Sequence, residues 1–153
     1  MKPHLVIGLG NRFMGDEGIA WHIINRLASD PRLPADTELL WGGTDLLAFA
    51  NLIDGRNRVT VVDALLDPSR VGSVAVFEAN EGLHDLENGQ WYVHHLSLTQ
   101  AINLLRVASP SAANARLRLI AISIGSARFQ PELSPGLAAR VPQILERVVQ
   151  ELA

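Results

Sequence analysis

The sequence predicts a single α/β domain, in which a twisted, mostly parallel five-stranded sheet carries helices on both faces. Short β-branched runs alternate along the chain with segments whose apolar residues recur at helical spacing, which is the pattern of repeated β–α units. The runs are continuously apolar, as 5–7 is, and such runs suit strands that are buried on both faces. Because the 153 residues contain no repeat or linker, one domain over 1–153 accounts for the chain.

Glycine, proline and polar residues bound each expected element. Strands are expected at 5–7, 37–41, 58–62, 71–78 and 116–124. Helices are expected at 17–27, 46–53, 98–107 and 136–152, the last beginning in practice near Pro142. The polar segment 80–90 is expected to be a loop. Because no helix separates the third strand from the fourth, this order is compatible with an antiparallel fourth strand.

Composition and charge exclude several classes of protein. Hydrophobic residues make up 48% and charged residues 19% of the chain, which indicates a packed domain. A net charge of −3 argues against nucleic acid as the main partner, because phosphates attract lysine and arginine. The absence of cysteine excludes disulfides, thiolate ligands and a cysteine nucleophile. No apolar run reaches the roughly 20 residues that span a membrane, so we expect no membrane partner. We therefore expect a cytoplasmic protein, and a monomer.

Polar side chains gather at the expected carboxyl ends of the strands, where open α/β sheets bind their ligands. Asp16 and Glu17 follow the first strand, Asp63 ends the third, and His94 and His95 follow the fourth. Each has an ordinary structural explanation as well. The two acids favour a helix N-terminus, Asp63 suits a loop, and a histidine can simply pack. Adjacent histidines on an extended segment point in opposite directions, so at most one is expected to face a site.

The turn after the first strand, Gly8-Leu9-Gly10-Asn11, permits close backbone approach but is a poor nucleotide-binding motif. A dinucleotide fingerprint needs glycine where Phe13 stands, and no Gly-Lys-Ser/Thr follows to make a phosphate loop. Together, a glutamate, an aspartate and a histidine from three strand ends suit a borderline divalent cation such as zinc or nickel. Three ligands leave coordination positions open, and an open site of this kind can polarise a carbonyl and activate water.

In the order and spacing of these motifs, the chain resembles the hydrogenase maturation protease family. The resemblance rests on the glycine turn with Asp16-Glu17-Gly18, on Val61-Val62-Asp63-Ala64, and on a histidine at 94 followed by Leu96 and Leu98. The late strand ending at Ile124-Gly125, then Leu133-Ser134-Pro135 and a last helix, extends the resemblance over most of the chain.

The resemblance implies an endopeptidase of hydrogenase maturation, of aspartyl type or metal-dependent. It implies that Glu17, Asp63 and His94 bind a nickel ion that arrives with its substrate, the precursor of a [NiFe]-hydrogenase large subunit. Zinc or cadmium is expected to substitute for nickel. The nickel marks the precursor as ready, and the protease then removes a short C-terminal extension. Asp16 is a candidate catalytic residue on position alone, either supporting a ligand or transferring a proton.

Two departures from the family pattern bear on function. Trp41 precedes the Gly42-Gly43-Thr44 turn, where family members usually carry an aspartate that is thought to contribute to processing. His95 follows His94, and we favour His94 as the ligand because the following leucines then fall in the family's register. Three alternatives stay open. They are a relative that binds a metallated partner without cutting it, a metallopeptidase with its own zinc, and a hydrolase like peptidyl-tRNA hydrolase, which also opens with a strand and Gly-Leu-Gly-Asn.

Overall fold

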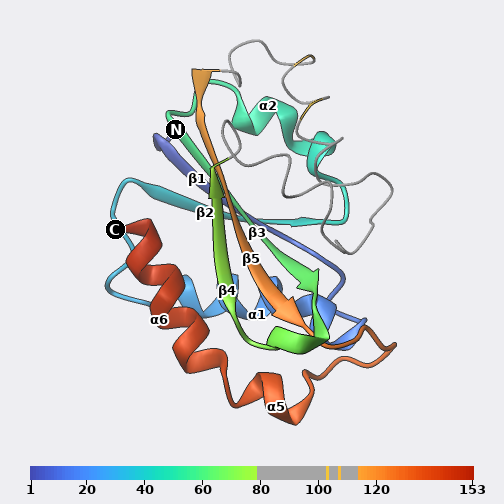
Figure 1. Ribbon diagram of the computed structural model, residues 1–153. Coiled ribbons are helices and arrows are strands. Elements are labelled where there is room, and N and C mark those ends of the chain that lie inside the picture. Colours follow the sequence, from blue (N-terminus) through green and yellow to red (C-terminus); the bar gives the residue numbers. More distant parts are fainter. Residues whose placement is uncertain (79–102, 104–106, 108–113) are drawn as a thin grey trace.

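Five strands form one sheet in the order β2-β1-β3-β5-β4 in a computed structural model, which describes residues 1–78, 103, 107 and 114–153 (Figure 1). The strands are β1 (His4–Leu9), β2 (Thr37–Gly43), β3 (Arg58–Leu66), β4 (Val74–Glu78) and β5 (Arg116–Ile124). The first four in this spatial order run parallel, and β4 joins the edge of the sheet antiparallel to β5. The predicted mostly parallel five-stranded sheet is therefore confirmed, and the step without a helix does lead to an antiparallel strand.

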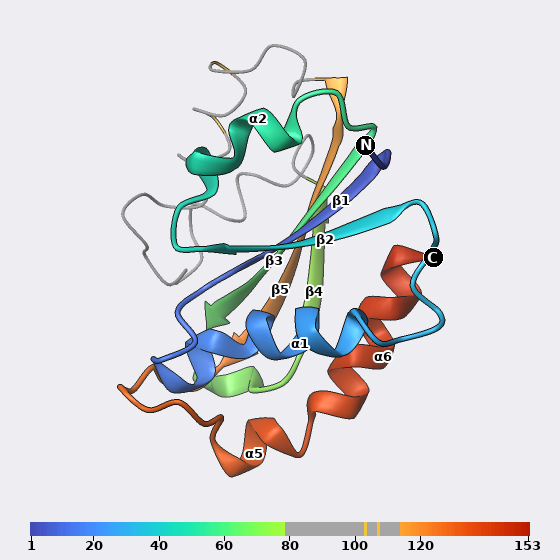
Figure 2. The same ribbon diagram turned by 180° about the vertical axis from the view of Figure 1, so that it is seen from behind.

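Helices cover both faces of this sheet, as the sequence predicts (Figures 1 and 2). The α-helices are α1 (Ile19–Leu27), α2 (Ala50–Ile53), α5 (Pro135–Ala138) and α6 (Val141–Leu152). Short 3-10 turns lie at η1 (Gly15–Gly18), η2 (Leu46–Phe49) and η3 (Pro68–Arg70). Helices α1 and α6 pack together on one face, and α2 lies on the other.

The last helix begins where Pro142 predicts, because α6 starts at Val141 and Pro142 lies in its first turn, where the missing N–H of proline costs nothing. The residues before it, predicted as part of the same helix, form the separate short helix α5. Two strand boundaries differ from the prediction. The third strand does not end at Asp63 but runs on to Leu66, because β5 pairs with it along its whole length. The fourth strand begins at Val74, because the chain turns at residues 71–73, where Gly72 has a φ of +86°. The expected loop 80–90 and nearly all of the helix expected at 98–107 lie outside the described residues.

Two apolar layers hold the helices to the sheet. The stripe of α6, with Val141, Ile144, Val148 and Leu152, is buried together with the apolar face of α1. On the opposite face, Leu46 of η2 and Ile53 of α2 pack on side chains of β1, β3 and β5. Each fully buried aliphatic side chain contributes about 1.5–3 kcal/mol, so these layers fix where the strand ends lie.

A buried histidine links three neighbouring strands, β2, β1 and β3, on the α1 side of the sheet. His4 of β1 is 1% exposed, and its Nε2 lies 2.9 Å from Thr60 Oγ1 of β3. Its Nδ1 lies 3.3 Å from Thr37 Oγ1 of β2. Burial, together with the nearby Arg58 guanidinium, lowers the pKa of His4 to about 4. The imidazole is therefore neutral in the folded protein at pH 7.

The His4 cluster makes stability depend on pH. The unfolded chain takes up a proton at His4 near pH 6.5, whereas the folded chain does so only near pH 4. The stabilisation is therefore complete above pH 6.5 and is lost as pH falls towards 4. We expect His4 to account for a loss of about 2 kcal/mol in unfolding free energy between pH 7 and pH 5. Urea unfolding of His4→Asn over this range should show a correspondingly shallower pH dependence; a slope equal to that of the parent would contradict the assignment.

Candidate active site at the carboxyl edge of the sheet

The turn that follows β1 wraps closely around η1. Gly10 has a φ of +140°, and its N–H donates to Gly43 O of β2 at 2.8 Å. A Cβ on Gly10 would lie 2.4 Å from the backbone oxygen of Glu17, and a Cβ on Gly18 would lie 2.7 Å from Arg12 Cα. Asn11 shapes the turn between them, because its side chain accepts a hydrogen bond from Phe13 N at 3.0 Å. The glycines of the first motif therefore serve the approach of two backbone segments, not a nucleotide.

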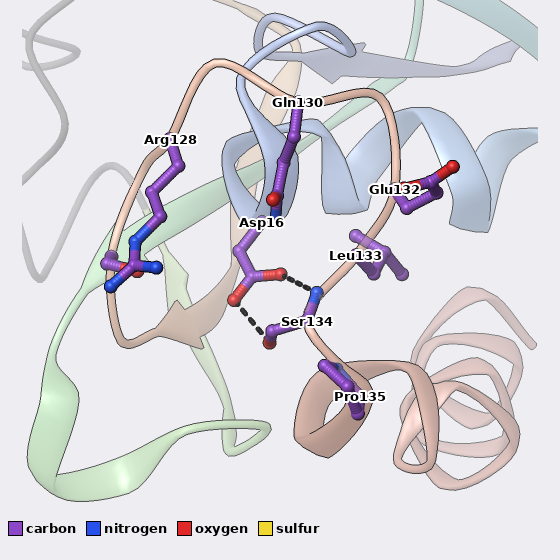
Figure 3. Close-up of a pocket in the computed structure, with 8 residues that line it drawn as sticks. Asp16, Arg128, Gln130, Glu132, Leu133, Ser134 and Pro135 are labelled. Carbon is purple, nitrogen blue, oxygen red and sulfur yellow. Dashed lines mark hydrogen bonds between the residues drawn. The ribbon is translucent and has the colours of Figure 1, made fainter.

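Asp16 connects η1 to the segment that precedes α5. Its side chain is buried, with the residue 5% exposed, and its Oδ1 accepts a hydrogen bond from Ser134 N at 2.7 Å. The Ser134 hydroxyl donates to Oδ2, also at 2.7 Å (Figure 3). Neither η1 nor α1 has a side-chain hydrogen bond at its N-cap, so Asp16 does not play the capping role that its position allows. It binds a segment 118 residues away instead.

Glu17 and Asp63 are the two acids buried most deeply beside this turn. Glu17 is 2% exposed on η1, and Asp63 is 1% exposed on β3. The pairing of β3 with β1 ends at Val62, so Asp63 is the first residue of β3 beyond it. Ala64 N donates to Asp63 Oδ1 at 2.7 Å. Since η1 lies against β3, the structure brings both carboxylates to the same edge of the sheet.

The predicted histidine ligand cannot be placed relative to these acids, because His94 and its neighbour His95 fall outside the described residues. Among the residues that the structure does describe, no group of three or more histidine, cysteine, aspartate or glutamate side chains could hold a metal ion. Two of the three predicted ligands are thus brought to one region, and the third is untested. Carboxylate oxygens are suitable ligands for a borderline cation, so the donors present fit the expected ion.

Trp41 occupies the α1 face of the sheet at the end of β2. It pairs in register with Gly8, and its ring carbons lie 3.0–3.1 Å from where a Gly8 Cβ would stand. It is half-buried and packs on the same apolar layer as Ile24. The side chain thus fills space above a glycine. A carboxylate at this position would lose that packing.

A pocket of about 470 Å³ opens beside Asp16 (Figure 3). Its lining is Asp16, Ser126, Arg128, Gln130, Glu132, Leu133, Ser134 and Pro135. Figure 3 shows Arg128 extending along the side of the pocket opposite Ser134 and Pro135. The sequence gives no sign of Arg128 or Gln130 as site residues. Leu133-Ser134-Pro135 contributes to the family resemblance only, and the sequence does not link Ser134 to Asp16, because a hydrogen-bond partner 118 residues away has no local signal.

An open, mostly parallel α/β sheet with acidic side chains buried at its carboxyl edge defines an α/β domain whose site lies beyond its strand ends. Comparison with known proteins identifies the family to which this domain belongs. Residues 21–151 match the model of the hydrogenase maturation protease family, and the chain belongs to that family of endopeptidases. This membership decides against the peptidyl-tRNA hydrolase alternative. The family processes the precursor of the hydrogenase large subunit.

Individual relatives agree with the family match. The chain is 25% identical to the hydrogenase 2 maturation protease of Escherichia coli K12, over 97% of this chain and 89% of the relative. The [NiFe] hydrogenase maturation protease HybD of Thermococcus kodakarensis has a similar structure, with a TM-score of 0.82, 25% identity and full coverage of both chains. The maturating endopeptidase HybD of E. coli gives a TM-score of 0.80 at 25% identity, covering 99% of this chain and 92% of that one. The predicted fold and family are both confirmed. No helix among the described residues is long and apolar enough to cross a membrane.

The close approach at Gly10 predicts a specific sensitivity to a single methyl group. In Gly10→Ala the new Cβ meets Glu17 O and the backbone is held at a positive φ, so we expect a loss of about 3 kcal/mol in unfolding free energy. Gly136→Ala is the matched control, because a Cβ there has nothing within 4 Å and α5 favours alanine. It should change stability by no more than about 1 kcal/mol. Equal effects in thermal or urea unfolding would show that the turn tolerates the extra atom.

The Asp16–Ser134 link predicts a graded loss of stability. Ser134→Ala removes the hydroxyl donor but keeps the backbone donor, and should cost about 1 kcal/mol. Asp16→Ala leaves both donors unsatisfied and should cost about 2–3 kcal/mol. Ser69→Ala is the control, because its hydroxyl donates to Asp67 in an exposed pair. Equal unfolding free energies for the three variants in urea would show that the buried Asp16–Ser134 hydrogen bonds stabilise the fold no more than the exposed Ser69–Asp67 pair does.

Proposed function

We propose that this chain removes the C-terminal extension from the nickel-loaded precursor of a [NiFe]-hydrogenase large subunit, with nickel serving as the recognition element. Family membership supports the reaction class. The observation that carries the rest is the burial of Glu17 and Asp63, from η1 and β3, at one edge of the sheet. Charged groups attract a cation most strongly where the surroundings are poor in water, and these two carboxylates are nearly inaccessible.

In this proposal Glu17, Asp63 and His94 bind the nickel ion that the precursor brings. Two oxygens and an imidazole nitrogen suit nickel, and zinc or cadmium can take its place. Three protein ligands leave positions for the precursor, so the ion can hold the scissile carbonyl in place or polarise it. His94 is preferred to His95 on the register of the leucines that follow it.

Asp16 is proposed as the candidate catalytic group. It neighbours Glu17 and its carboxylate lines the pocket, so a proton on water or substrate in the pocket is within its reach. Both of its oxygens accept hydrogen bonds from Ser134, which holds the carboxylate in one orientation. Proton transfer requires a carboxylate that is held in one orientation. If a hydrogen bond from water or substrate replaced the one from the Ser134 hydroxyl, Asp16 would keep this orientation.

The proposal is tested by mixing the protein with nickel-loaded precursor and following the mass of the large subunit. We expect Glu17→Gln, Asp63→Asn and His94→Ala each to lower processing at least about 100-fold, because each removes a ligand. His95→Ala should be milder. Glu146→Gln, an exposed carboxylate of α6, is the control and should process normally.

Four outcomes would contradict parts of the proposal. Full activity of any one ligand variant would remove that residue from the ligand set. A greater loss in His95→Ala than in His94→Ala would reverse the choice of histidine. Binding of the precursor without shortening would favour the relative that binds a metallated partner but does not cut it. Stoichiometric zinc held tightly by the purified protein would favour a metallopeptidase with its own metal.

A further inference from the structure

Two Arg-Phe dipeptides lie on neighbouring backbone segments at the carboxyl edge of the sheet. Arg12-Phe13 follows β1, and Arg128-Phe129 follows β5. The next residue of each segment, Met14 and Gln130, forms a parallel bridge, and Gly15 N donates to Gln130 O at 2.7 Å. Each Arg-Phe dipeptide therefore ends one residue before a member of this bridge. We call these four residues the Arg-Phe surface.

The aromatic rings of this surface face solvent. Phe13 is 52% exposed and Phe129 is 87% exposed. The Arg12 guanidinium lies 4.8 Å from the Phe13 ring centroid and 5.2 Å from that of Trp21, which holds its charge at the surface beside the ring. Large apolar side chains exposed together are typical of interaction sites, and arginine and aromatic residues dominate the binding energy of protein interfaces.

The charges of the surface are not neutralised within the part of the chain that the structure describes. Arg12 and Arg128 form no ion pair there, whereas Arg32, Arg56 and Arg118 each bind a carboxylate. Asp16, the acid nearest to Arg128 in the pocket lining, is already engaged by Ser134. Two cations with no ion-pair partner among the described residues thus stand at one edge of a chain whose net charge is −3.

We propose that the Arg-Phe surface docks an extended segment of the protein substrate that carries carboxylates beside apolar side chains. The inference rests on the proposed function, so the segment belongs to the large-subunit precursor. Paired arginines attract carboxylates, and the two phenylalanines offer apolar contact between them.

The place of the surface supports this use. Arg12-Phe13 leads through Met14 into η1, which carries Glu17, and Arg128 also lines the pocket that contains Asp16 (Figure 3). A segment held on the Arg-Phe surface is therefore delivered to the edge of the sheet where the proposed ligands lie. The surface sets affinity for the precursor and leaves the reacting groups untouched.

The test compares steady-state processing of nickel-loaded precursor by two double variants, Arg12→Gln with Arg128→Gln and Phe13→Ser with Phe129→Ser. We expect KM to rise about tenfold in each, with cadmium binding unchanged and with kcat unchanged in the phenylalanine variant. Added salt should raise KM for the parent but have little effect on the arginine variant, since its charges are gone. The double lysine variant, Arg12→Lys with Arg128→Lys, should recover part of the affinity and the salt dependence.

Controls and contradicting results are matched to the surface. Arg26→Gln is the control for charge, because Arg26 of α1 is exposed and has no ion pair among the described residues. Leu52→Ser is the control for apolar exposure, because Leu52 is 43% exposed. Both should keep the parent KM. Double variants with a KM within twofold of the parent overturn the docking surface alone. A parent protein that does not process the precursor overturns the proposed function, and this inference with it.

Discussion

The close approach of the β1 turn to η1 is the contact on which the site depends. Gly10 stands so near the Glu17 carbonyl that no larger residue fits, and Gly18 accepts the Arg12 backbone in return. Because β1 leaves the sheet at this point, β3 continues without that neighbour and Asp63 comes next along it. One backbone constraint therefore buries Glu17 and defines the edge where Asp63 lies. Asp16 then ties the same short helix to the segment before α5, so that the C-terminal third of the chain also positions it.

The fold was largely predictable because its signals are local. Continuous apolar runs and helical stripes determine which segments are strands and helices, and these signals are independent of the rest of the chain. The errors fall where a neighbour decides the outcome. Asp63 looks like the end of a strand, since an acid follows an apolar run, but pairing with β5 extends β3 to Leu66. The start of α6 at Val141 was predictable, because proline disfavours an interior helix position and Pro142 is itself a local signal.

The candidate site was predictable only in part, for the same reason. Asp16, Glu17 and Asp63 stand out because they follow strands, and strand ends are where such sheets place their sites. Ser134, Arg128 and Gln130 give no such sign, since they meet Asp16 and the β1 turn only through tertiary folding. The sequence suggests a capping role for Asp16, yet its carboxylate is used across the molecule. Trp41 shows the opposite limit: its position in the motif suggests function, while its contacts with the Gly8 and Ile24 layer are those of a packing residue.

The central proposal is that two buried carboxylates from separate elements, Glu17 of η1 and Asp63 of β3, bind one cation together. A crystal structure of the protein soaked with cadmium tests it most directly. The account predicts a single strong site in which oxygens of both Glu17 and Asp63 lie within bonding distance of the ion, with a histidine nitrogen completing the protein ligands. An ion bound by only one of these carboxylates, or bound elsewhere while both remain unligated, would contradict it.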